Sequence, residues 1–438
     1  MVSNELLSLR AAVCDLNGQM RGKRMLLSDL DKLHAGKLRM PFSAINVDIW
    51  GRDIEDSPLV FETGDADGFL LPTERDPLPM PWLQKKSKFV PMWMFNDNGT
   101  PFEADPRHAL RGVLENYDKK GWQVIAATEL EFFLVHDHSP RLAPPKNPFN
   151  SRSLCNSDTL SLELLDIFEI FFNDLYQACD QMGIDTQAAS SECGIGQFEM
   201  SLKHCNAMKM ADNTWLFKSL VRGLARKHNM AATFMAKPFV DDAGNGLHVH
   251  FSVIDEDGVN IFDDGTELGS SLLKNAVAGC LQAMQASTLI FAPYPNSYKR
   301  MVNGSHAPTS VCWAYENRTA AIRIPSGDLK ARRIEHRVAG GDINPYLLFS
   351  SILGAAFLGI DENLKPPTAL IGNAYEQNFG RLVPDIETAL SIFEKDKTIA
   401  KILPHNLIQH FCRTKRQEIS TFEKLGEENH WETYLEKV

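Results

Sequence analysis

KARRIEHRV, residues 330–338, alternates ionisable and apolar side chains. In a β-strand alternate side chains share a face, so Arg333, Glu335 and Arg337 point one way. Ile334 and Val338 then point the other way. A carboxylate between two guanidinium groups, with apolar residues behind it, suits a site that binds anions and a metal ion. An exposed strand with a solvated charged face is the commoner explanation when the stretch is taken alone.

Three other predicted strands also place ionisable side chains on one face and bulky apolar ones on the other. They carry Glu129 and Glu131 in ATELEFFLV, Glu192 and Glu199 in SECGIGQFEM, and His248, His250 and Ser252 in GNGLHVHFSV. If the four faces converge, they gather five carboxylates and a histidine, which repel one another unless cations are present. Mg²⁺ or Mn²⁺, which favour oxygen ligands with one imidazole, fits such a cluster. Each pair taken singly is explained as well by a structural role.

A cluster of arginines that falls within fewer than forty residues includes Arg300, Arg318, Arg323, Arg333 and Arg337. Arginine grips carboxylate and phosphate groups through two parallel hydrogen bonds. Metal ions together with an arginine cluster indicate phosphoryl transfer from a nucleotide. The sequence has no GxxxxGK[ST] loop, which excludes a P-loop enzyme, and it has no GxGxxG fingerprint.

The composition is that of a globular protein, with 44% hydrophobic and 23% charged residues. The length of 438 residues predicts two domains, or a small domain on a large one. A net charge of −11 without a long basic run argues against a nucleic-acid or membrane partner. No secretory signal is recognisable at the start, and the longest apolar run, 352–360, is too short to span a bilayer. Eight single cysteines without a CxxC pair predict neither disulfides nor zinc, as in a reducing cytosol.

The order of the predicted elements indicates an α+β fold. Residues 9–27 form a hairpin around Asn17-Gly18, and residues 45–95 continue a small β-rich domain with long loops. A helix begins after Asp105-Pro106, so we place the domain boundary at residue 102. The second domain, 103–438, alternates a strand over 123–136 and further strands with helices over 161–182, 212–229, 269–287 and 345–358, and it ends in a helical tail from residue 385.

Several longer motifs resemble the glutamine synthetase family, in the family's order and over nearly the whole chain. They are DPR at 105–107, ELEF at 129–132, GQFE at 196–199, ATFMAKP at 232–238, GLHVH at 246–250, NRTAAIRIP at 317–325 and KARRIE at 330–335. The resemblance implies a β-grasp-like domain over 1–102 and a catalytic domain over 103–438. In the catalytic domain a curved antiparallel sheet forms a funnel with flanking helices. It also implies a homo-oligomer of stacked rings, most often a dodecamer.

The resemblance also assigns roles to the residues of the funnel, which holds two or more metal ions, Mg²⁺ or Mn²⁺. One ion would be bound by Glu131, Glu192 and Glu199, and the other by Glu129, His248 and Glu335. Glutamate would be bound by Arg300, Arg337 and Gly244, and ATP by His250, Ser252, Arg323, Lys330 and Arg333. Arg318 would stabilise the transferred phosphoryl group. The implied reaction has two steps. Glutamate attacks ATP to give γ-glutamyl phosphate, and an amine then displaces phosphate to give an amide.

Two positions depart from the glutamine synthetases that use ammonia. Those enzymes hold ammonium with an aspartate of the small domain and a glutamate of a flap, and here Ser43 and His306 occupy these positions. Loss of both carboxylates weakens ammonium binding and leaves room for a substituent on the nitrogen. The γ-glutamylpolyamine and γ-glutamylalkylamide synthetases show the same loss, and this chain resembles them. His306 would then line the amine pocket and act as a base, or it is an incidental loop histidine.

We therefore expect a cytoplasmic glutamate–amine ligase that converts ATP to ADP and phosphate. Its partners would be glutamate, a primary amine, ATP and other copies of the chain, with neither nucleic acid nor a membrane. A glutamine synthetase that uses ammonia is the alternative, and polyamines and alkylamines both stay open as the amine. A non-catalytic sensor or scaffold is a third interpretation, against which the six retained metal ligands argue.

Overall fold

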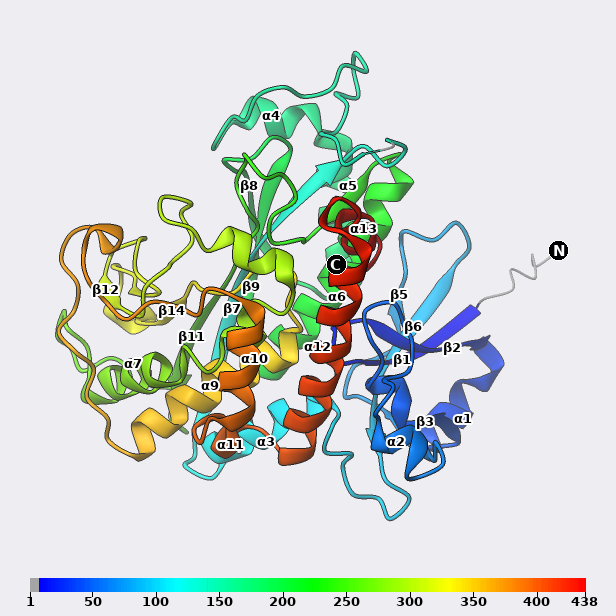
Figure 1. Cartoon of the computed structure of the whole chain (residues 1–438), viewed down its shortest axis with the longest axis horizontal. Helices are drawn as coiled ribbons and strands as arrows, with labels where there is room; N and C mark the ends of the chain where they lie inside the picture. The colour runs from blue at the N-terminus through cyan, green and yellow to red at the C-terminus, as the bar shows by residue number, and fades with distance from the viewer. Residues whose placement is uncertain (1–7, 140) are drawn as a thin grey trace.

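The computed structural model describes residues 8–139 and 141–438, and these residues form two β-sheets with helices around them (Figure 1). The strands are β1 (Ser8–Cys14), β2 (Met20–Leu26), β3 (Leu38–Pro41), β4 (Asp67–Pro72), β5 (Leu78–Pro79), β6 (Ser87–Phe95), β7 (Gln123–Val135), β8 (Thr186–Ser191), β9 (Gln197–Asn206), β10 (Ala231–Thr233), β11 (Leu247–Ile254), β12 (Trp313–Tyr315), β13 (Ile322–Ile324) and β14 (Ile334–His336). The α-helices are α1 (Leu30–His34), α2 (Pro58–Phe61), α3 (Pro106–Asp118), α4 (Leu162–Ile167), α5 (Glu169–Gln181), α6 (Ala207–Lys227), α7 (Ser271–Ala283), α8 (Thr288–Phe291), α9 (Pro345–Asp361), α10 (Ile386–Lys395), α11 (Ile399–Ile402), α12 (His405–Leu425) and α13 (His430–Lys437).

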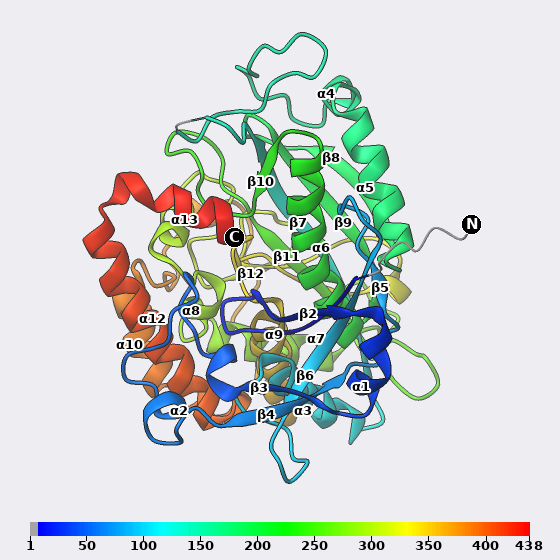
Figure 2. The same ribbon diagram turned by 90° about the vertical axis from the view of Figure 1, so that its right-hand side faces the viewer.

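The smaller sheet is built on the predicted hairpin, which is confirmed. β1 and β2 pair antiparallel, and Gly18 in the connecting turn has φ +79°, a conformation that glycine adopts without strain. β1 also pairs in parallel with β6, and the strand order is β2-β1-β6-β4-β3, with β5 on β6. This sheet faces the viewer in Figure 2. The predicted boundary at residue 102 lies between β6 and α3, and the division into two domains stays a prediction.

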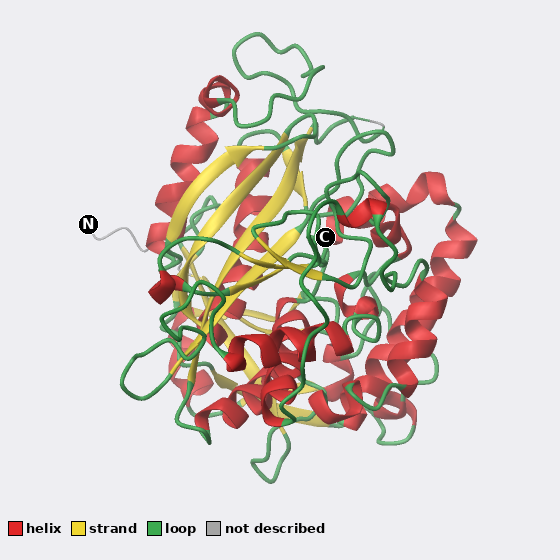
Figure 3. Cartoon of the chain, turned by 90° about the vertical axis from the view of Figure 1, so that its left-hand side faces the viewer, coloured by secondary structure: helices red, strands yellow, loops and turns green. Residues whose placement is uncertain are grey.

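The larger sheet has the order β12-β13-β14-β11-β7-β9-β8, with β10 on β7. Its pairs are antiparallel except for β12 and β13, which run in parallel. Its long strands twist and curve beside the helices in Figure 3, as sheets of L-amino acids do. The predicted α+β fold with a curved, largely antiparallel sheet is therefore confirmed.

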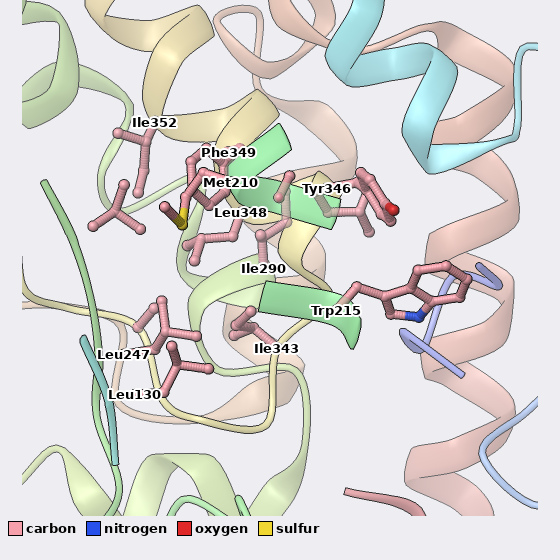
Figure 4. Close-up of a cluster of buried hydrophobic side chains, with 14 of the residues drawn as sticks. Leu130, Met210, Trp215, Leu247, Ile290, Ile343, Tyr346, Leu348, Phe349 and Ile352 are labelled. Atoms are coloured by element: carbon pink, nitrogen blue, oxygen red, sulfur yellow. The ribbon is translucent and has the colours of Figure 1, made fainter. Parts of the chain in front are cut away.

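Helix α9 lies in the core. Figure 4 shows buried side chains of α9, α6 and the larger sheet in contact, among them Tyr346, Phe349, Met210, Leu130 and Leu247. Helices α7 and α9 approach so closely that a Cβ atom at Gly279 would lie 2.0 Å from the Ala355 carbonyl oxygen. No helix in the described part of the chain has both the length and the apolar character needed to cross a membrane.

Two predicted helices differ from the structure. The segment expected as one helix over 161–182 forms α4 and α5, which are separated at the buried residue Phe168 with φ −105° and ψ 22°. The helix expected from Asp212 begins at Ala207, where the Asn206 side chain accepts a hydrogen bond from the Met208 amide at 3.0 Å. Strand β9 thus runs directly into α6, and periodicity alone does not separate the two.

A buried polar network fixes the hairpin of the smaller sheet to helix α12. Asn17 Nδ2 donates to Glu418 Oε1 at 2.6 Å, and Lys415 Nζ donates to Glu418 Oε2 at 2.8 Å. Lys415 Nζ and the Tyr294 hydroxyl also donate to Asn17 Oδ1, at 2.7 Å and 3.0 Å. Both charged groups are paired and hydrogen-bonded, which buried charges require, so the network holds the hairpin against α12.

Candidate active site

Neighbouring strands of the larger sheet carry the predicted metal ligands on one face. On β7, Glu129 and Glu131 are partly exposed, whereas Leu130 and Phe132 are buried. The strand register places these residues opposite each other: Glu129 and His248, Glu131 and Glu199, and His250 and Glu335. Directly opposite residues on antiparallel strands have Cβ atoms roughly 5 Å apart. The faces therefore converge, as the alternation predicted.

Two overlapping groups of side chains are close enough to hold a metal ion. Ligand atoms of Glu129, Glu199 and His248 lie within 4.8 Å of one another, and so do those of Glu129, His250 and Glu335. His248 Nδ1 lies 3.1 Å from Glu129 Oε2, and His250 Nε2 lies 3.1 Å from Glu129 Oε1. His250, which was expected to bind ATP, thus also lies among the candidate ligands.

The carboxylates around Glu199 disturb one another's ionisation. Burial, followed by the charges of Glu129, Glu131 and Glu192, raises the pKa of Glu199 to about 9. Burial and the charge of Glu131 raise the pKa of Glu192 to about 7. Glu131 and Glu192 therefore lie close to Glu199, although they belong to neither three-residue group. A divalent cation removes the repulsion, so this donor set fits a metal ion with oxygen ligands.

Glu335 connects the metal-binding face to the arginine cluster. Its carboxylate accepts a hydrogen bond from Arg323 Nη1 at 2.9 Å and another from Arg337 Nη1. Burial opposes ionisation of Glu335, but His248 and Arg337 outweigh it and hold its pKa below the usual value. Arg323 Nε and Arg337 Nε are buried without a hydrogen-bond partner among the described residues. Buried donors of this kind fit an anionic ligand such as a carboxylate or phosphate.

The buried Arg300 side chain lies against the loop that carries Gly244 and Gly246. A Cβ atom at Gly244 would lie 2.9 Å from Arg300 Cγ, and one at Gly246 would lie 2.7 Å from Arg300 Nη2. The Gly246 amide donates to Glu131 Oε2 at 2.5 Å. Arg337 is near enough for its charge to act on Arg300. The three residues expected to bind glutamate, Gly244, Arg300 and Arg337, are thus brought together beside a candidate metal ligand.

A cavity of about 740 Å³ extends from the metal-binding face along β7, β9 and β11. Four of the five residues expected to bind ATP line it: His250, Ser252, Lys330 and Arg333. Its wall along β7 runs from Glu129 to Ile125, roughly 13 Å at the rise of a β-strand, which is long enough for a nucleotide. Arg323, the fifth, is not among the residues that line the cavity, because its guanidinium is held by Glu335.

The remaining predicted site residues are Arg318, His306 and Ser43. Arg318 is exposed, and its charge works to lower the pKa of both Glu192 and Glu199, which places it near the carboxylates. His306 is exposed with φ +61°, and Ser43 is buried in the short 3₁₀ helix over 42–45. None of the described hydrogen bonds or ion pairs joins Ser43 or His306 to the metal-binding face. The residue next to His306 is tied to the arginine cluster, because the Ala307 carbonyl accepts from the Tyr375 hydroxyl at 2.8 Å, and Arg300 and Arg337 lie near enough for their charges to act on Tyr375.

Sequence reasoning missed Gln197, whose buried amide links the two loops of the site. Gln197 Nε2 donates to the Gly244 carbonyl at 3.0 Å, to Asn245 Oδ1 at 3.2 Å and to Glu131 Oε2 at 3.4 Å. Its Oε1 accepts from the Gly194 amide at 2.9 Å. The signal was available, because Gln197 stands in the GQFE motif beside Glu199.

Glu316 was also missed. Its carboxylate accepts hydrogen bonds from Arg323 Nη2 and from the Ser326 amide and hydroxyl. Its backbone has φ +46°, which is strained for a residue with a side chain. Glu316 thus binds Nη2 of the Arg323 guanidinium, whereas Glu335 binds Nη1. No pattern in the sequence marks Glu316 for that position.

Known proteins share this architecture. The family described as glutamine synthetase, catalytic domain, matches residues 103–434. The chain is 34% identical to gamma-glutamylputrescine synthetase PuuA of Escherichia coli (strain K12), over 97% of this chain and 90% of that protein. It is 30% identical to glutamate–isopropylamine ligase of a Pseudomonas species, over 97% and 94%. A crystal structure of a novel glutamine synthase homolog superposes with a TM-score of 0.84 over 99% of both chains, at 23% identity. The chain belongs to the glutamine synthetase family.

Proposed function

We propose that this protein is an ATP-dependent ligase that forms a γ-glutamyl amide from glutamate and a primary organic amine. The contacts of Glu335 carry the proposal, because they join the metal-binding face to Arg323 and Arg337. Metal ligands beside arginines with unpaired donors suit phosphoryl transfer to a carboxylate. The two relatives above carry putrescine and isopropylamine in their names, which supports an organic amine over ammonia.

Six residues are proposed to bind the divalent metal ions: Glu129, Glu131, Glu192, Glu199, His248 and Glu335. When bound, Mg²⁺ or Mn²⁺ neutralises charge on the phosphate oxygens of ATP. Room for two or more ions is supported by the two groups of candidate ligands, which overlap at Glu129. His250 serves either as a further ligand or as an ATP contact, since it lies in one of these groups and also lines the nucleotide cavity.

In the activation step, Arg300, Arg337 and the Gly244 backbone orient glutamate. Lys330 and Arg333 hold the phosphates of ATP, with Ser252 further along the same cavity and Arg323 behind them. The γ-carboxylate oxygen attacks the γ-phosphorus, the bond to the β–γ bridging oxygen breaks, and ADP leaves. Arg318 stabilises the charge on the transferring phosphoryl group, a role in which an arginine contributes strongly to the rate.

In the second step the amine nitrogen attacks the acyl carbon of γ-glutamyl phosphate, and phosphate leaves. We place Ser43 and His306 in the amine pocket, with His306 taking a proton from the amine. Members of the family often form oligomers, and we propose stacked rings, as a dodecamer, in which Ser43 meets the funnel of a neighbouring subunit. We also propose a cytoplasmic location, which the eight unpaired cysteines support.

An ADP-release assay with glutamate, ATP and Mg²⁺ tests the proposal across ammonia, alkylamines and diamines. We expect kcat/KM for at least one primary organic amine to exceed that for ammonia. A substantially higher value for ammonia than for every organic amine would identify a glutamine synthetase instead. Absence of ADP release with every amine, despite ATP binding, would leave the interpretation as a sensor or scaffold.

A further inference from the structure

A second cavity, of about 840 Å³, lies outside the metal-binding face and the nucleotide cavity. It is formed by the loop before α4, the loop over 238–242 and helix α13. Apolar side chains make up much of its wall, notably Leu142, Phe239, Val240 and Trp431. Val240 is 75% exposed, so an apolar side chain stands open to solvent here. The mixture of aromatic and aliphatic surface suits a small organic ligand rather than water alone.

The charge of this cavity is negative. Asp241 and Asp242 line it, and no lysine or arginine is among the described residues that do. Asp242 is occupied by the protein, because its carboxylate accepts from the amides of Ile195 and Ala243, each at 2.8 Å. Asp241 is exposed and takes part in none of the described side-chain hydrogen bonds or salt bridges. The Lys237 ammonium group donates to the Asp242 carbonyl, and it lies near enough for the charges of Asp242 and Asp241 to act on it.

The aromatic rings fit a cation with an alkyl chain. The Phe239 ring is held edge-on against Phe133, with centroids 5.6 Å apart, so it is a fixed part of the wall. Trp431 is partly buried in α13 and offers an indole, the strongest of the cation–π partners. A carboxylate with aromatic and aliphatic surface is complementary to an alkylammonium ion. It is poorly complementary to glutamate or a nucleotide, which are anions.

The cavity is joined directly to the glutamate loop. The Ile195–Asp242 hydrogen bond connects the turn after Glu192 to the loop that leads to Gly244. Gln197 then holds the Gly244 carbonyl from the other side. A ligand against Asp241 therefore rests on the same loop that positions glutamate.

We propose that this cavity binds an organic amine cation, an alkylammonium or one end of a diamine, through Asp241, Phe239 and Trp431. The inference rests on the proposed function for the choice of amine, and it adds a binding site to that function. Two sources share this chemistry: the distal group of the substrate amine, and a second amine molecule that modulates the glutamate loop.

Binding of 1,4-diaminobutane to the full-length protein, measured by calorimetry without ATP or glutamate, tests the site. Asp241→Asn removes the charge at an exposed position and should weaken binding by about tenfold or more. Trp431→Leu keeps an apolar side chain and should also weaken it. Asp257→Asn, at another exposed aspartate outside the cavity, is the matched control and should bind like the wild type.

Steady-state kinetics separates the two sources. A raised KM for the amine in Asp241→Asn identifies the substrate's distal group. If KM for the amine is unchanged in Asp241→Asn, but added diamine no longer changes KM for glutamate, the bound amine is a second molecule.

Unchanged diamine binding in Asp241→Asn would overturn the proposal. A changed mass by light scattering with unchanged binding would also overturn it and assign the surface to a subunit contact. Binding that depends on Asp241 in a protein without ligase activity would refute the proposed function alone.

Discussion

The two halves of the proposed reaction are built differently. The activation half lies on β7, β9, β11 and β14, where backbone pairing fixes which side chains meet. The amine half rests on Ser43 in a short 3₁₀ helix and on His306 in an exposed loop. The first half is held by strand pairing, whereas the second rests on two segments outside the larger sheet. The difference indicates that the larger sheet positions the groups for activation, and we expect the choice of amine to be set by segments outside that sheet.

The largest expected effect comes from Arg318, which belongs to the activation half. Arg318→Ala should lower ADP release and amide formation by about 10³-fold, because charge on the transferring phosphoryl group loses its arginine. The side chain is exposed, so stability should change little. The rise in Tm on adding Mn²⁺ should persist, since the ligands stay in place.

Arg381→Ala is the matched control, since Arg381 is also exposed and its side chain makes none of the described hydrogen bonds or salt bridges. We expect its activity to stay within about twofold of the wild type, as for most surface substitutions. If Arg318→Ala kept more than a tenth of the activity, Arg318 would have no part in activation.

Gln197 should give the next largest effect. Gln197→Ala removes the donor that holds the Gly244 carbonyl and Glu131, so KM for glutamate should rise by about 10–100-fold. KM for ATP should change far less, because the nucleotide cavity does not include Gln197. The variant also leaves buried polar groups unpaired, which costs about 1–3 kcal/mol of stability. Equal rises in both KM values would instead point to general loosening of the site.

The difference between the sheet and the loops also explains which parts of the site could be predicted from the sequence. Side-chain alternation has a period of two in any strand, so the shared face of Glu129, Glu131, His248 and Glu335 was predictable before the strand order was known. The position of Arg323 was not, because Glu316 holds it through a strained turn that no pattern marks. Likewise the break at Phe168 lies within an apolar periodicity that favours one continuous helix, and only tertiary packing shows that it ends there.

Metal binding in the activation half should depend on pH, because Glu192 and Glu199 have raised pKa values. Raised pKa values mean that the folded, metal-free protein keeps protons on Glu192 and Glu199 that the unfolded chain has lost. Their contribution to stability is full below the ordinary carboxyl pKa and is lost as pH rises through about 7 and about 9. Metal ions displace these protons, so Mn²⁺ affinity should rise by up to about a hundredfold per pH unit below pH 7, where both protons leave, and by up to about tenfold per unit between pH 7 and pH 8.

The rise in Tm produced by Mn²⁺ at each pH measures this effect. Glu192→Gln cannot titrate and should flatten the rise around pH 7. A shift that is the same at pH 6 and pH 8 in the wild type would show that neither carboxylate is protonated before the metal ion binds.

His306 should have the smallest effect on the activation step, and it gives the sharpest test of the comparison. Asparagine tolerates a positive φ well, so His306→Asn keeps the loop conformation while removing the imidazole. Loss of one neutral hydrogen bond to the amine should raise KM for the amine by about 2–10-fold, and loss of the proposed base should slow amide formation by about 10²-fold or more. The burst of ADP in a single turnover without amine should stay unchanged, because that burst reports activation alone. A burst reduced as strongly as in Arg318→Ala would join His306 to the activation half, and the two halves could no longer be assigned to separate parts of the molecule.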